Sequence, residues 1–125
     1  MDQDLVSWLS FAEADLFAAE DLLQNKRVLP AISVYHSHQC IEKLFKAILI
    51  KHNQSVPKIH NLNKLLLMTA VYVKDLDSLE NQITDINELF PLLRYPTGDQ
   101  ITAEDARKSY ETASLLFQKL AQHIQ

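Results

Sequence analysis

One stretch of this sequence, His36-Ser37-His38-Gln39-Cys40-Ile41-Glu42-Lys43-Leu44-Phe45-Lys46-Ala47, carries a row of polar side chains along an otherwise apolar helix. The row stands at steps of three or four residues, which places it on one helical face; it consists of Gln39, Glu42, Lys43 and Lys46. A helix that is apolar around the rest of its circumference is central in its domain. Its charges must then be paired or line a groove, because an unpaired buried charge is costly.

The flanking sequence predicts helices on both sides of this one. Apolar residues recur at three- and four-residue steps, and Pro30, Asn61 and Thr102 mark helix starts. Thr102 with Asp105 caps the last helix, and Asp77 with Glu80 also has the spacing of a capping box. The expected helices span about residues 5–25, 30–52, 61–74, 77–90 and 103–124. We therefore expect an all-α fold, an up-and-down four-helix bundle with a short accessory helix.

Length and composition agree with that fold. The chain has 125 residues, 47% of them hydrophobic, with one glycine and four prolines. This predicts a single domain over residues 1–125 with few turns. The lone Cys40 excludes an internal disulfide, and no apolar run has membrane-spanning length. The first residues lack the basic segment of a signal peptide, so we expect a soluble cytoplasmic protein without a membrane partner.

The net charge of −4 conceals a partition along the chain. Residues 26–74 hold eight Lys or Arg and one acid, while residues 1–25 and 75–125 are acidic. A basic middle with acidic flanks indicates either an anion-binding surface or complementary surfaces within the fold or an oligomer. We expect a homodimer on this ground, since such surfaces complement one another.

Few residues are candidates for metal binding or acid–base catalysis. His36 and Cys40 share a helical face but His38 does not, so neither a metal site nor a cofactor is predicted. Glu42 with Lys43 or Lys46 is either a tuned acid–base pair or a structural ion pair. His60 precedes a helix start, where an imidazole either bonds nearby backbone or acts as a base.

A loop after the fourth helix adds a further candidate, Arg94-Tyr95-Pro96. An Arg fork can grip a phosphate or carboxylate, and Tyr can stack on a base. A structural bridge from Arg94 to Glu42 explains the same residues, and both interpretations stay open. We predict that Glu42 pairs with Arg94 or with a lysine of its own row.

Four motifs in order along the chain resemble the HEPN domain family, the "higher eukaryotes and prokaryotes nucleotide-binding" helical domains. They are Ala12-x-x-Asp15-Leu16-x-x-Ala19, Gln39-x-x-Glu42-Lys43-x-x-Lys46-Ala47, Lys58-Ile59-His60-Asn61-Leu62 and Arg94-Tyr95-Pro96. The resemblance implies a helical bundle, frequent homodimers and a minimal nucleotidyltransferase partner in a toxin–antitoxin-like pair. It assigns binding roles to Gln39, Glu42, Lys43, Lys46, His60, Arg94 and Tyr95.

Many members of that family are metal-independent ribonucleases in which four to six residues separate an Arg from a following His. No arginine of this chain has such a histidine. We therefore predict no catalytic residue, and a non-enzymatic subunit that binds a nucleotide, RNA or a partner protein. Two alternatives remain: a divergent ribonuclease in which His38 or His60 supplies the base, and a purely structural dimerisation module.

Overall fold

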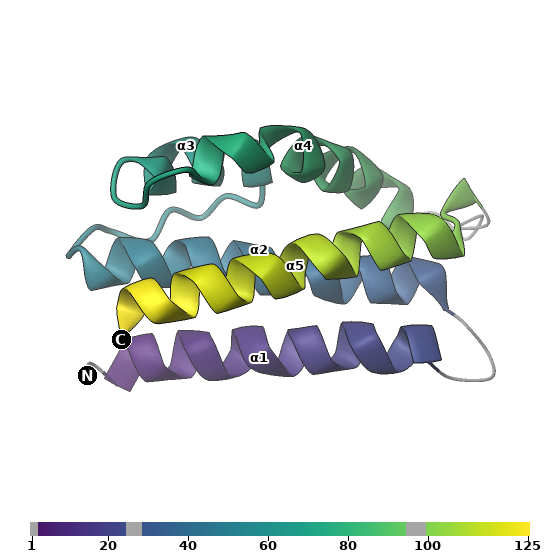
Figure 1. Ribbon diagram of the computed structural model, residues 1–125, viewed down its shortest axis with the longest axis horizontal. Helices are drawn as coiled ribbons and strands as arrows, with labels where there is room; N and C mark the ends of the chain where they lie inside the picture. Colours follow the sequence, from purple (N-terminus) through teal and green to yellow (C-terminus); the bar gives the residue numbers. More distant parts are fainter. Residues whose placement is uncertain (1–2, 25–28, 95–99) are drawn as a thin grey trace.

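The computed structural model describes residues 3–24, 29–94 and 100–125. Three long helices, α1 (Gln3–Gln24), α2 (Pro30–Lys51) and α5 (Ala103–Ile124), lie side by side (Figure 1). Helix α1 runs antiparallel to the other two. Two shorter helices, α3 (Leu62–Ala70) and α4 (Glu80–Leu89), form a second layer together with the 3-10 turns η1 (Leu76–Leu79) and η2 (Phe90–Arg94). The predicted all-α fold is confirmed: the described residues form five α-helices and no strand.

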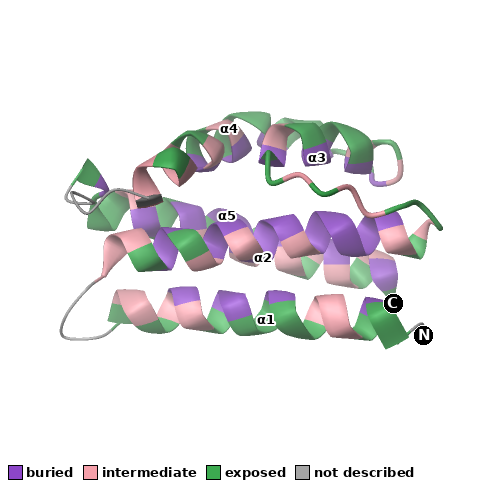
Figure 2. Ribbon diagram, turned by 180° about the vertical axis from the view of Figure 1, so that it is seen from behind, coloured by how far each residue is buried: buried purple, intermediate pink, exposed green. Residues whose placement is uncertain are grey.

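Helix α2 is the centre of the molecule, as the sequence predicts. It contacts α1, α5, α3, α4 and η2, and most of its residues are buried (Figure 2). Small buried side chains, among them Ala12 and Ala19 of α1 and Cys40 of α2, allow α1 and α2 to approach closely. The Ser33 hydroxyl donates to the Ala19 carbonyl at 2.9 Å across that contact.

Large apolar side chains of α2, α3, α4 and α5 fill the main core, and Phe45 is the largest of those that are fully buried. A smaller cluster of Val34, Ile101 and Ala106 closes the end near the start of α5. At the opposite end, Lys51 donates to the Ile124 carbonyl at 3.0 Å, and His52 Nε2 lies 3.0 Å from His123 Nε2. These contacts join the ends of α2 and α5.

Helix starts with a side-chain cap are found where they were predicted. The Asn61 side chain accepts a hydrogen bond from the Lys64 amide, and Thr102 with Asp105 forms a complete capping box. The predicted box of Asp77 and Glu80 is wrong, because α4 begins after Leu79 without a side-chain cap.

The third helix is shorter than predicted, since α3 ends at Ala70 and not near Lys74. Asp75 adopts a left-handed backbone with φ 67°, which redirects the chain after α3 and starts η1. Pro91 also acts as expected: α4 stops at Leu89 and the chain continues as the tighter turn η2.

Candidate functional site

Helix α2, which carries the polar row, lies between α1 on one side and the α3–α4 layer on the other (Figure 2). Two buried carboxylates, one on α1 and one on α2, organise it. Each carboxylate holds one lysine of the row and one histidine. The row is therefore two ion-pair clusters and not a line of free cations.

Asp15 of α1 is the centre of the first cluster. It forms an ion pair with Lys43 of α2, and its Oδ1 lies 2.9 Å from His36 Nδ1. The carboxylate is nearly buried while both partners are partly exposed. Because its two partners stand on α2, Asp15 fixes the position of α1 against the polar row.

Glu42 of α2 is the centre of the second cluster. The Lys46 ammonium donates to Glu42 Oε2 at 3.0 Å, and both side chains are almost fully buried. His60 Nδ1 lies 3.1 and 3.2 Å from the two carboxylate oxygens. A carboxylate only accepts, so His60 donates through Nδ1. The predicted pairing of Glu42 with a lysine of its own row is confirmed.

His60 is the exposed member of the second cluster. It stands in the connector just before α3, and its side chain is 65% exposed. With Nδ1 bound to Glu42, the other ring nitrogen, Nε2, remains available to a ligand. The His60 imidazole is thus held in a fixed orientation at the surface by a buried acid.

His38 lies beneath this cluster and is fully buried. Its ring stacks on Phe90 of η2 with centroids 4.0 Å apart and an interplanar angle of 16°. Neither ring nitrogen has a hydrogen-bonding partner among the described residues, and Nδ1 is 3.9 Å from Glu42 Oε1. Burial lowers the pKa of His38 to about 4, although Glu42 acts in the opposite direction. His38 is consequently neutral at pH 7.

Of the other predicted site residues, Gln39 is half-buried on the same face of α2. Arg94 ends η2, but its side chain and the whole of Tyr95 lie outside the described residues, and so does the predicted Arg94–Glu42 bridge. Cys40 is buried in the apolar core, and burial raises the pKa of its thiol.

The residues that the structure describes contain no group of three or more His, Cys, Asp or Glu side chains that could hold a metal ion. None of the helices in this part of the chain is both long enough and apolar enough to cross a membrane.

Comparison with known proteins shows to which family the chain belongs. The HEPN domain pattern matches residues 5–123. The chain belongs to the HEPN domain family. Two solved structures share the fold of this HEPN domain. TT1696 from Thermus thermophilus superposes with a TM-score of 0.82 at 18% identity, over 97% of this chain and 98% of that one. ST0689, an archaeal HEPN homologue, gives 0.75 at 18% identity over the full length of both chains. No curated protein sequence matches.

The sequence did not predict that His36 and Asp15 belong to the site of this HEPN domain, where the two side chains pair. A signal for Asp15 was present: the acid falls between Ala12, Leu16 and Ala19 on the apolar face of its helix. An acid at such a position requires a partner from another element. Which residue partners Asp15 depends on how α1 packs against α2, and the pattern within one helix does not determine that packing.

A patch of exposed apolar side chains adjoins the first cluster of this HEPN domain. Phe11 is 63% exposed, and its ring lies 6.0 Å from the Lys43 ammonium. Tyr35, also exposed, meets His36 edge-on with centroids 5.3 Å apart, and Ile32 lies one turn earlier on α2. Contacts thus run without a break from Phe11 through Lys43, Asp15 and His36 to Tyr35. We call Phe11, Ile32 and Tyr35 the α1–α2 patch.

Proposed function

We propose that this protein is a non-enzymatic HEPN subunit that acts by binding a partner protein through the α1–α2 patch. The observation that carries the proposal is that exposed Phe11 and Tyr35 lie against Lys43 and His36, the two side chains that Asp15 holds. Exposed Ile32 lies about one helical turn before Tyr35 on α2. Exposed aromatic side chains beside organised charge are typical of binding surfaces. The surface needs little reordering to bind, which favours association.

On the ground of the HEPN resemblance, we propose that the partner is a minimal nucleotidyltransferase that acts with this chain in a toxin–antitoxin-like pair. A protein fits the patch better than a free nucleotide does. Lys43 and Lys46 are each held by a carboxylate, and a phosphate would have to compete with Asp15 and Glu42 for them. An apolar protein surface faces no such competition at Phe11 and Tyr35.

Calorimetric titration of the full chain with a minimal nucleotidyltransferase tests this function. We expect binding that Phe11→Ser or Tyr35→Ser weakens by about tenfold or more, because each removes a large exposed anchor. Phe17→Ser is the matched control: Phe17 is similarly exposed on α1 but lies outside the patch. Absence of binding, or equal loss with the control, contradicts the proposal. A thermal shift with ATP alone would favour the nucleotide-binding alternative.

One observation favours the ribonuclease alternative as a second candidate. Glu42 orients the exposed His60 imidazole as an acidic residue orients a catalytic histidine in many hydrolytic sites. His60 could then remove a proton from an RNA hydroxyl through Nε2. The absence of an Arg-x4–6-His motif keeps this candidate second, and RNA cleavage assays with His60→Ala decide it.

We also propose that the chain forms a homodimer, from the charge partition and the family resemblance. Light scattering at high micromolar concentration tests it, and a mass of one chain contradicts it. A dimer that binds neither a nucleotide nor a partner protein and cleaves no RNA would support the structural-module alternative.

A further inference from the structure

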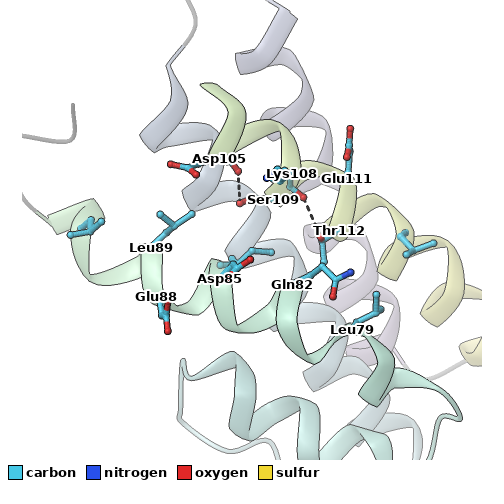
Figure 3. A pocket seen from close by; sticks show the side chains of 13 residues that line it. Leu79, Gln82, Asp85, Glu88, Leu89, Asp105, Lys108, Ser109, Glu111 and Thr112 are labelled. Carbon is cyan, nitrogen blue, oxygen red and sulfur yellow. Dashed lines mark hydrogen bonds between the residues drawn. The ribbon is translucent and has the colours of Figure 1, made fainter. Parts of the chain in front are cut away.

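A large cavity lies not at the α2 row but between α4 and α5 (Figure 3). It is an open groove with a volume of about 640 Å³. Its apolar lining comes from Leu79, Ile86 and Leu89 on one wall and from Leu115 on the other. Leu115 of α5 is half exposed there, so the groove presents apolar surface to solvent.

The rim of this groove is acidic. Asp85 and Glu88 stand on α4, and Glu111 stands on α5, with Lys108 as the only basic side chain of the described lining (Figure 3). Glu111 already pairs with Arg107. Asp85 and Glu88 make no ion pair with any residue that the structure describes. The groove therefore favours an apolar occupant with basic side chains at its ends.

Another surface of the same chain has this chemistry. On α3 and the turn after it, Leu67, Met68 and Val71 are exposed, Leu67 to 73% and Val71 to 77%. Lys64 precedes them by one helical turn, which places Lys64, Leu67, Met68 and Val71 on one face at positions i, i+3, i+4 and i+7. Lys74 follows. We call this surface the α3 stripe.

We propose that the α3 stripe of one copy occupies the α4–α5 groove of a second copy. Apolar side chains then cover the apolar walls, and Lys64 and Lys74 face the acids of the rim. Every copy carries both surfaces, and in the two-fold arrangement that we propose two copies exchange the contact reciprocally. The proposal specifies the homodimer proposed above and leaves the α1–α2 patch open for a partner protein.

The charge partition of the sequence agrees with this contact. The α3 stripe belongs to the basic middle of the chain, and the groove belongs to its acidic last third. Within one molecule the stripe is on the outer side of α3, opposite its buried residues Leu62, Leu65 and Thr69. The stripe therefore cannot reach the groove of its own chain, and the complementary charges meet only between copies.

Light scattering on single and mixed variants tests this contact. One variant removes the stripe by Leu67→Asp with Val71→Asp, and the other removes the groove by Leu115→Asp. All three positions are exposed, so the folds should persist, which circular dichroism checks. We expect a two-chain mass for the wild type at high micromolar concentration and a one-chain mass for each variant alone.

Light scattering on an equal mixture of the two variants tests directly whether the stripe of one copy binds the groove of another. One retains an intact groove and the other an intact stripe, so the mixture should again form a two-chain species, although more weakly. Phe17→Asp, exposed on α1, is the control and should remain dimeric. A monomeric wild type, dimers of either variant alone, or a mixture without association overturns the proposal. The nucleotidyltransferase titration uses other residues, so either proposal can fail without the other.

Discussion

Lys46 donates a 3.0 Å hydrogen bond to Glu42 from one helical turn away on α2, and both side chains are almost fully buried. Two opposite charges inside a core stabilise it only as a pair, because each alone would carry an uncompensated desolvation cost. The same carboxylate holds His60 at the surface. Glu42 therefore links the stability of the core to the geometry of the candidate site.

Replacing Glu42 with Gln should lower the free energy of unfolding by about 3 kcal/mol, because the Lys46 ammonium would stay buried without a counter-charge. Urea unfolding monitored by circular dichroism measures this. Lys46→Met in the same chain should recover much of the loss, since the stranded charge is then gone. The matched control is Glu104→Gln at the exposed Glu104–Arg107 pair, where little change is expected. Equal effects at both sites would show that burial does not matter at Glu42.

Stability should fall as the pH is lowered from about 6.5 toward 4, because of His38. Burial lowers the pKa of His38 from its ordinary 6.5 to about 4 in the folded chain. Between these values the unfolded chain binds a proton that the folded chain does not, so acid favours unfolding. The stabilising contribution is fully present above pH 6.5, and its loss amounts to roughly 3 kcal/mol by pH 4.

Urea unfolding at several pH values checks the contribution of His38. His38→Phe, which keeps an aromatic ring against Phe90, should flatten the dependence in this range. Phe90→Leu retains the buried imidazole and should keep most of the slope. An unchanged slope in His38→Phe would assign the acid sensitivity to other groups.

Thr102→Ala should cost about 1 kcal/mol of unfolding free energy, because the hydroxyl that accepts the Asp105 amide hydrogen bond is lost at the start of α5. Thr102→Ser keeps an equivalent hydroxyl and should be close to the wild type. Thermal melting of the three proteins gives the comparison. A loss as large in the serine variant would indicate that the threonine methyl group matters, and not the cap.

The sequence predicts most of this fold because helices are determined locally. Periodicity and caps such as Asn61 and Thr102 depend on residues a few positions apart, and they place α2, α3 and α5 correctly at their starts. Asp77 failed as a cap for a local reason too. After the left-handed Asp75, the chain forms the 3-10 turn η1 over Leu76–Leu79, where the start of a capped α-helix was expected.

The site was less predictable, because its key contacts join different helices. The spacing on one helix predicted that Glu42 pairs with Arg94 or with a lysine of its own row, and in the structure that lysine is Lys46. The pairing of Asp15 with Lys43 depends on how α1 lies against α2, and the stacking of His38 on Phe90 depends on where η2 packs. The spacing of apolar residues along one helix does not determine either of these packing arrangements.

The purified chain should not cleave RNA faster than a His38→Ala, His60→Ala double variant. His38 is buried without contact to solvent and with a lowered pKa, so it cannot exchange protons with a bound RNA at pH 7. His60 is exposed and oriented by Glu42, which makes it the one residue of the two that could serve as a base. No arginine stands at the family's spacing from it to complete the reaction.

Gel assays of a short labelled RNA without added metal measure this. His60→Ala tests the exposed base. Glu42→Gln combined with Lys46→Met, which limits the loss of stability expected for Glu42→Gln alone, tests the orientation of the imidazole. Metal-free cleavage that disappears in His60→Ala and falls in the Glu42→Gln, Lys46→Met variant would overturn the non-enzymatic proposal. It would identify Glu42 and His60 as an acid-oriented base, because a contaminating nuclease would be unaffected by either change.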